Sequence, residues 1–169
     1  YIVDEVYNSQ LLSKASQTPL QIHPTVMKTA GYAGILYHHL SSNATRADIH
    51  IVVSMGQQGV MWICPKDFDI NNDTNHVAGT GLSESDGFVI ANSINKCVYV
   101  QANPVHDDQI RNTSGAGDTF CGSLVHYHTN INGGKLSVNA IKYALAGAKL
   151  SLMSNTAIPV DIKSRIEKK

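Results

Sequence analysis

Four consecutive residues, Gly115, Ala116, Gly117 and Asp118, combine small side chains with one carboxylate at the start of a stretch with helical spacing. Small side chains leave the first backbone N–H groups of a helix unshielded, and these groups bind anions at the positive end of the helix dipole. A carboxylate next to a bound phosphate would repel it if binding were the only purpose. We therefore predict that Asp118 removes a proton from a hydroxyl nucleophile, while the N–H groups stabilise charge on a transferring phosphoryl group.

A simpler explanation applies to the same short pattern. An acidic residue in the first turn of a helix interacts favourably with the helix dipole, and Gly-x-Gly turns are common. The four residues alone leave the catalytic and the structural interpretations equally open.

The longer string at positions 112–120, Asn-Thr-Ser-Gly-Ala-Gly-Asp-Thr-Phe, favours the catalytic interpretation. It closely resembles the second signature of the PfkB, or ribokinase-like, family of carbohydrate and nucleoside kinases, Asp-Thr-x-Gly-Ala-Gly-Asp-x-Phe. The resemblance implies that Asp118 is the catalytic base, that Gly115–Gly117 form an anion hole, and that Asn112 and Thr113 contact ATP. It also implies Mg²⁺, which bridges phosphate oxygens through water. The departure is Asn112, where the family commonly has Asp beside the phosphates and metal waters, and this puts metal handling in question.

A second resemblance lies about 60 residues earlier, in the order that the family shows. Residues 51–60, Ile-Val-Val-Ser-Met-Gly-Gln-Gln-Gly-Val, are similar to the family's strand and turn along the ATP phosphates and ribose. The resemblance implies that Ser54 and Gly56 contact nucleotide. Taken alone, such a turn between strands is most often a plain hairpin.

The C-terminal part resembles the family in two further places. The helix expected from Asn139 to Met153 looks like the one along the adenine pocket, which implies that Asn139 and Ala144 contact nucleotide, although an alanine-rich helix is more often plain core. Residues 151–159 resemble the pseudouridine kinase branch, so pseudouridine is the favoured acceptor, with adenosine, ribose or another sugar as alternatives. Many relatives bind a monovalent cation near this loop.

The elements that must position these residues follow from periodicity and breakers. The pattern predicts a single α/β layered domain over residues 1–169. The resemblance implies that this domain has a ribokinase-like (Rossmann-like) sheet flanked by helices. A strand is expected to lead directly into the turn at Gly115, and Trp62 and Cys121 are expected in the core. Helices are expected at the N-terminus, from about Pro24 to Leu40, and at residues 121–127, 136–153 and 160–168. Strands are expected at residues 50–55, 60–64, 88–91 and 97–102. A hairpin turn is expected at residues 92–96 and a long loop at residues 65–86.

Composition excludes several classes of function. The 169 residues carry 13 Lys and Arg against 13 Asp and Glu and are 43% hydrophobic, which argues against disorder and against nucleic acid as a partner. No apolar run is long enough to span a membrane. Three cysteines without a Cys-x-x-Cys pair favour a reducing, cytoplasmic location, and the scattered histidines predict no zinc site. The quaternary state stays open, with a homodimer as one option.

The resemblance covers about residues 50–159 and leaves part of the family's pattern unmatched. Family members are considerably longer, and the first strands of the sheet, the β lid and the Asn-x-x-Glu magnesium element are not found here. We therefore expect the C-terminal nucleotide-binding portion of a kinase, which phosphorylates nothing alone. The alternative is a non-catalytic nucleotide- or phosphate-binding module, or a decayed kinase, in which the same turn holds an anion without turnover.

Overall fold

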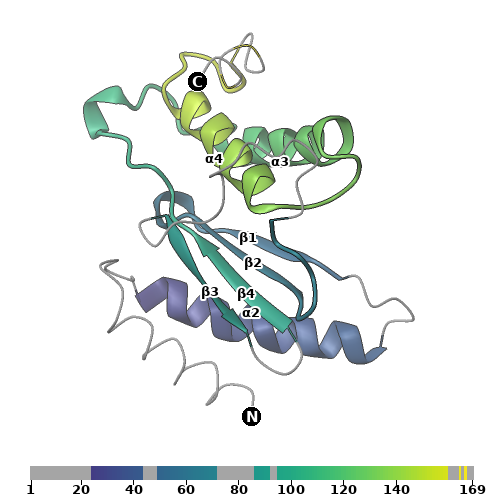
Figure 1. Ribbon diagram of the computed structural model, residues 1–169. Helices are drawn as coiled ribbons and strands as arrows, with labels where there is room; N and C mark the ends of the chain where they lie inside the picture. Colours follow the sequence, from purple (N-terminus) through teal and green to yellow (C-terminus); the bar gives the residue numbers. More distant parts are fainter. Residues whose placement is uncertain are drawn as a thin grey trace. The chain divides into compact units, whose positions relative to one another are not determined.

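The computed structural model describes residues 24–43, 49–71, 86–91, 95–159, 164 and 166. These residues form a mixed α/β fold with a four-stranded antiparallel sheet (Figure 1). The chain divides into two compact units: a sheet unit, Tyr1–Phe68 with Leu82–Ala102, and a helical unit, Asp69–Gly81 with Asn103–Lys169. The expected helix before Pro24 lies outside the described residues. So do residues 72–85 of the expected long loop and most of the expected terminal helix at 160–168.

The sheet has the strand order β1-β2-β4-β3, and every neighbouring pair is antiparallel. Its first two strands confirm the expected strand, turn and strand, since Ile51 pairs with Ile63 and Ser54 with Val60. The bounds of the strands are β1 (Ile51–Ser54), β2 (Val60–Pro65), β3 (Gly87–Ala91) and β4 (Asn95–Val100).

Strand β4 begins two residues earlier than the sequence predicts. Asn95 and Lys96, which we expected in the hairpin turn, pair with Pro65 and Cys64 of β2. Their polar groups are satisfied there, because Lys96 Nζ donates to the Phe68 carbonyl at 2.8 Å and the buried Asn95 side chain also has a partner. Local turn propensity was therefore overridden by pairing across the sheet.

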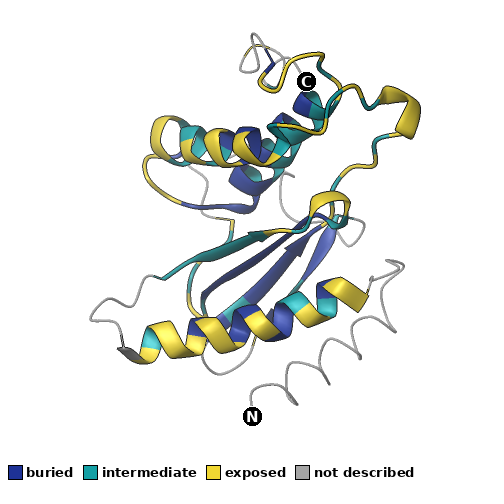
Figure 2. Cartoon of the chain, turned by 180° about the vertical axis from the view of Figure 1, so that it is seen from behind, coloured by how far each residue is buried: buried dark blue, intermediate teal, exposed yellow. Residues whose placement is uncertain are grey.

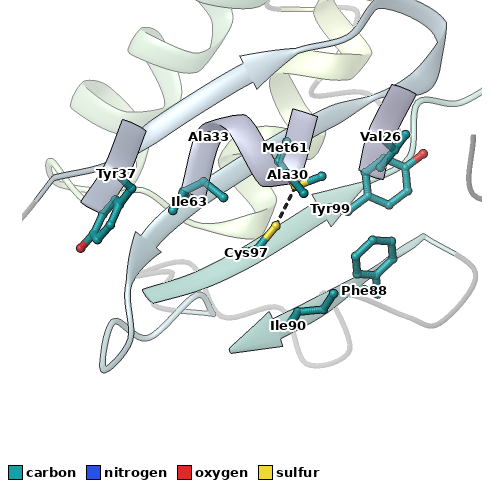
Figure 3. Close-up of a cluster of buried hydrophobic side chains, with 10 residues drawn as sticks. All are labelled: Val26, Ala30, Ala33, Tyr37, Met61, Ile63, Phe88, Ile90, Cys97 and Tyr99. Carbon is teal, nitrogen blue, oxygen red and sulfur yellow. Dashed lines mark hydrogen bonds between the residues drawn. The ribbon is translucent and has the colours of Figure 1, made fainter. Parts of the chain in front are cut away.

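One face of the sheet is covered by helix α2 (Pro24–Asn43), which begins at the predicted proline. Proline fixes φ in the helical range and has no N–H to leave unpaired, so it suits this position. The helix is buried on one side and exposed on the other (Figure 2). Its buried side chains follow a helical spacing and pack with alternate strand residues (Figure 3); the cluster is Val26, Ala30, Ala33, Tyr37, Met61, Ile63, Phe88, Ile90, Cys97 and Tyr99.

The intervening strand positions carry the opposite face of the sheet. Trp62 lies there and is fully buried, which confirms it as a core residue. Its indole Nε1 donates to His50 Nδ1 at 3.1 Å, and Phe68 packs edge-on against both rings. The tryptophan N–H thus has the acceptor that a buried indole requires.

The helical unit contains η2 (Asp107–Gln109), helix α3 (Ala116–His126), the π-helical turn η3 (Tyr127–Ile131) and helix α4 (Val138–Leu152). No strand leads into the turn at Gly115, so that expectation was wrong. The backbone N–H groups of Arg111 and Asn112 instead donate to the Leu152 carbonyl, at 2.8 and 3.2 Å. The segment before the turn is therefore bonded to the end of a helix rather than to a sheet edge.

Helix α4 packs against α3 through its small residues. Ser137 caps it by accepting from the Ala140 N–H at 3.2 Å. Ala140 and Ala144 are fully buried, and their small side chains let another backbone approach closely. Within the described residues, no helix has both the length and the apolar character needed to cross a membrane.

Candidate anion-binding turn

Helix α3 begins with a left-handed glycine and a set of unpaired backbone donors. Gly115 is the N-cap, with φ +81° and ψ −3°, and no side chain caps the helix. The first helical hydrogen bond runs from the Thr119 N–H to the Gly115 carbonyl at 2.8 Å. The N–H groups of Ala116, Gly117 and Asp118 precede that bond and have no acceptor among the described residues. Three N–H groups at the positive end of α3 are thus without an acceptor in the described part of the chain, and their binding of an anion stays a prediction.

Glycine at position 115 is required both by a neighbouring loop and by its left-handed backbone conformation. A β-carbon built on Gly115 would lie 2.3 Å from the Ala157 carbonyl oxygen, which is well inside van der Waals contact. Any L side chain would also be strained at this φ. Gly117 differs, because a β-carbon there would meet nothing within 4 Å. The fold therefore requires glycine at 115 but not at 117.

The Asp118 side chain is exposed in the first turn of α3. Its carboxylate has no hydrogen-bond or ion-pair partner among the residues that the structure describes. The carboxylate is therefore available to an incoming hydroxyl, and it lies on the residue whose own N–H completes the donor set. The carboxylate and the three backbone donors thus lie within one helical turn, and the chemistry assigned to them stays a prediction.

Asn112 and Thr113 lead into this turn in different ways. The Asn112 side-chain oxygen Oδ1 accepts from the Ser114 N–H at 2.9 Å, which closes a small turn next to Gly115. Thr113 is exposed. The amide oxygen at position 112 therefore serves the shape of the loop, and the contact of both residues with nucleotide stays a prediction.

Ser54 and Gly56, the predicted nucleotide contacts of the first motif, lie in the sheet unit. Ser54 is exposed at the end of β1, and Gly56 begins the short helical turn η1 (Gly56–Gln58) with φ +57°. Gly59 closes the hairpin with φ +94°, and a β-carbon there would lie 2.2 Å from the Val100 carbonyl. The turn is thus a hairpin connection with an exposed edge, and a contact of Ser54 and Gly56 with nucleotide stays a prediction.

The two predicted contacts on α4 have different surroundings. Asn139 lies in the first turn of the helix, is half-buried and already has an interaction partner. Ala144 is fully buried and packs within the helical unit. Its observed role is packing, as the core interpretation of the helix expects, and its contact with nucleotide remains a prediction.

For two further residues of α3 the prediction from the sequence failed. Thr119 was not singled out, and Cys121 was predicted to be buried. Thr119 is only 5% exposed, and its buried Oγ1 has no hydrogen-bond partner among the described residues. Thr119 lies one helical turn after Gly115, to whose carbonyl its N–H donates. Cys121, which we expected in the core, is exposed, because it lies on the side of α3 that carries Asp118 rather than on the side that packs against α4.

The groups with strongly shifted pKa values lie in the sheet. Burial raises the pKa of the Cys64 thiol to about 12, and burial also raises the pKa values of Cys97 and Tyr99. Tyr99 donates its hydroxyl to the Gln58 carbonyl at 2.7 Å, which favours its neutral form. No group of three or more His, Cys, Asp or Glu side chains that could hold a metal occurs in the described ranges.

Comparisons with known proteins do not extend these observations. No protein-family model matches the chain, and no curated protein matches it. The functional argument therefore depends on the residues and their geometry.

Proposed function

We propose that this chain is the nucleotide-binding portion of an ATP-dependent phosphotransferase that phosphorylates a primary hydroxyl of a sugar or nucleoside, with pseudouridine as the favoured acceptor. The observation that carries the proposal is the first turn of α3. An exposed carboxylate, Asp118, lies on the same turn as three backbone donors that have no acceptor within the described ranges. In this proposal the chain adopts part of a ribokinase-like layered fold and acts in the cytoplasm, where its three free cysteines are suited to a reducing environment.

The chemistry assigned to the turn requires little from the protein beyond placement and charge. Phosphoryl transfer passes through a transition state with negative charge spread over the equatorial oxygens. The N–H groups of Ala116, Gly117 and Asp118 would donate to those oxygens without reorganisation, because the helix already holds them in place. Asp118 would accept the proton of the attacking hydroxyl. In-line attack then depends mainly on orientation of the two substrates.

Magnesium enters this proposal with the nucleotide rather than as a resident metal. The described residues contain no cluster of metal-ligating side chains, and the Asn112 amide oxygen is already bonded to the Ser114 N–H. These residues do not fit a protein-held metal, so Mg²⁺ is expected as a complex with the ATP phosphates. A monovalent cation near residues 151–159 remains an expectation from the family resemblance.

The decisive experiment neutralises the proposed base. In the family that the chain resembles, the contacts with the acceptor sugar come largely from an N-terminal half that the resemblance does not cover. Turnover is therefore to be measured on a polypeptide that carries both this N-terminal half and the nucleotide-binding portion. Asp118→Asn should lower kcat by about 10² to 10⁴, the usual contribution of a general base. ATP affinity should be unchanged or tighter, because a negative charge beside the phosphates is removed.

A matched control separates this effect from a general change of charge. Asp108→Asn neutralises another exposed carboxylate in the same unit, on η2, and should leave both kcat and ATP affinity unchanged. If Asp118→Asn retains full transfer, the assignment of the base is wrong.

A second function is favoured by one specific observation. Position 112 carries an amide whose oxygen is used within its own loop, rather than the carboxylate typical of the family signature. The alternative is a phosphate- or nucleotide-binding module without turnover. It predicts binding of inorganic phosphate or ATP at residues 115–118 with no transfer from the complete polypeptide, a result that the kinase proposal does not allow.

A further inference from the structure

The C-terminal end of helix α4 contacts the anion-binding turn in two places, directly through a carbonyl and indirectly through Ala157. Its last carbonyl, that of Leu152, accepts the N–H groups of Arg111 and Asn112 just before the turn. One residue earlier, Ser151 Oγ donates to the Ala157 carbonyl at 2.7 Å. That same carbonyl oxygen occupies the space that a side chain on Gly115 would need. The chain from α4 to Ala157 is therefore in direct contact with the N-cap of α3.

Ser151 is unusual among the inward-facing residues of α4 because it is polar. It is fully buried on the same side of the helix as Ala144 and Gly147. Its hydroxyl lies six residues before its acceptor, so the bond closes the segment 152–157 into a compact loop. The bond is part-buried and its length of 2.7 Å is normal for O–H···O, so removing the hydroxyl takes one donor from the Ala157 carbonyl.

The exposed side of the same loop has a second set of hydrogen bonds. Thr156 Oγ1 donates to the Ile158 carbonyl at 2.9 Å, and Ser154 Oγ lies 3.0 Å from Thr156 Oγ1. The Thr156 N–H also donates to Ser154 Oγ at 3.2 Å. Ala157, which is itself exposed, thus lies between a part-buried bond to Ser151 and exposed bonds through Thr156.

We propose that Ser151 is a positioning residue for the anion-binding turn, acting through the Ala157 carbonyl, with Thr156 as a weaker second support. This inference rests on the proposed function, because it concerns how the same donors are held. Ser151 does not touch the anion. It holds the Ala157 carbonyl against position 115, where only glycine fits, and Gly115 directly precedes the N–H groups of Ala116, Gly117 and Asp118.

The test measures phosphate binding and folding separately. Inorganic phosphate is titrated into the ¹⁵N-labelled chain, and the amide resonances of residues 115–118 are followed by NMR. Ser151→Ala should weaken phosphate binding about fivefold, the effect of losing one hydrogen bond of about 1 kcal/mol. Ser151→Thr, which keeps the hydroxyl, should bind more tightly than Ser151→Ala. Ser123→Ala is the matched control, since Ser123 is a buried serine of α3 with no hydrogen bond to residues 152–158.

The outcomes distinguish this inference from the function on which it rests. If the unchanged chain shows no phosphate-dependent shift at residues 115–118, the proposed function fails and the inference fails with it. If the unchanged chain and Ser151→Ala bind phosphate equally, the anion site stands and the positioning role is wrong. If Ser151→Ala does not fold, the exposed variant Thr156→Ala decides: weaker phosphate binding with an unchanged melting temperature supports the role, and unchanged binding overturns it.

Discussion

The Ala157 carbonyl oxygen lies only 2.3 Å from the position that a β-carbon would take at residue 115, so only glycine fits there. This contact joins two loops that are distant in the sequence. It explains why the position that begins the helix carrying Asp118 accepts no side chain. The need for glycine at the start of the proposed anion hole thus comes in part from outside the motif itself.

Gly115→Ala is therefore expected to destabilise the helical unit. The left-handed backbone and the clash with a carbonyl together should lower the free energy of unfolding by about 2 to 5 kcal/mol. Chemical denaturation followed by circular dichroism measures this change. Gly122→Ala serves as the control, because a β-carbon there meets nothing within 4 Å. A Gly115→Ala variant as stable as the unchanged chain would show that Ala157 does not constrain the turn.

Gly117→Ala should instead affect the ligand and not the fold. The new methyl group has open space in the absence of a ligand, and alanine is favoured over glycine in a helix by about 0.5 to 1 kcal/mol. The methyl group would, however, obstruct the approach of an anion to the N–H groups of the first turn. We expect phosphate affinity to fall at least about tenfold, a loss of about 1.4 kcal/mol, while the melting temperature is maintained.

Gly122→Ala is the matched comparison for that experiment too, because it adds the same methyl group to an exposed position of the same helix. It should raise stability and leave phosphate affinity unchanged. Equal affinities for the two alanine variants, measured by isothermal titration calorimetry, would mean that no anion approaches Gly117.

Thr119→Val tests the role of the buried Thr119 hydroxyl. Because Oγ1 has no partner among the described residues, its replacement by a methyl group should remove a desolvation cost and raise the free energy of unfolding by about 1 kcal/mol. Thr119→Ser keeps the hydroxyl and is not expected to give this gain. Phosphate affinity should not change, because Oγ1 is inaccessible. A loss of stability in Thr119→Val would show that the hydroxyl has acquired a partner, such as a buried water.

Alkaline pH should destabilise the sheet unit through its buried thiols and Tyr99. Burial raises the pKa of Cys64 to about 12, whereas the ordinary value for a thiol is 9.0, so the unfolded chain loses this proton first. The stabilisation from the neutral thiol is complete below about pH 9 and is lost as the pH rises towards 12. Burial of Cys97 and Tyr99 acts in the same direction. Fluorescence of Trp62, the single tryptophan, follows unfolding of this unit.

The corresponding variant is Cys64→Ala. It should be less stable than the unchanged chain at pH 7, because a buried side chain is shortened, but its stability should decline less steeply between pH 9 and 12. Cys121→Ala removes the exposed thiol of α3 and should leave the pH dependence of Trp62 fluorescence unaltered. Identical slopes for the unchanged chain and Cys64→Ala would contradict the assignment.

Much of the local structure could be predicted because its signals act within a few residues. Pro24 begins α2 because proline has the helical φ and needs no hydrogen-bond acceptor. The glycines at 56 and 59 mark the hairpin between β1 and β2. Small residues at 115–117 indicated a helix start with available N–H groups, and such a start is present.

Other features depended on which surfaces meet, and these were predicted wrongly or not at all. Cys121 was expected in the core, yet it is exposed, because the direction from which α4 packs decides which side of α3 is buried. Asn95 and Lys96 looked like turn residues but pair with β2. A strand before Gly115 was expected where the backbone instead bonds to Leu152.

The sequence by itself determined the donors and the carboxylate of the proposed site, since Gly115, Gly117 and Asp118 are adjacent and their roles follow from the backbone of one helical turn. Only the tertiary structure decided that Ser151 and Ala157 hold this turn. A contact between segments far apart in the chain depends on packing and on the closing of a loop by one part-buried hydrogen bond, and neither leaves a periodic pattern in the sequence.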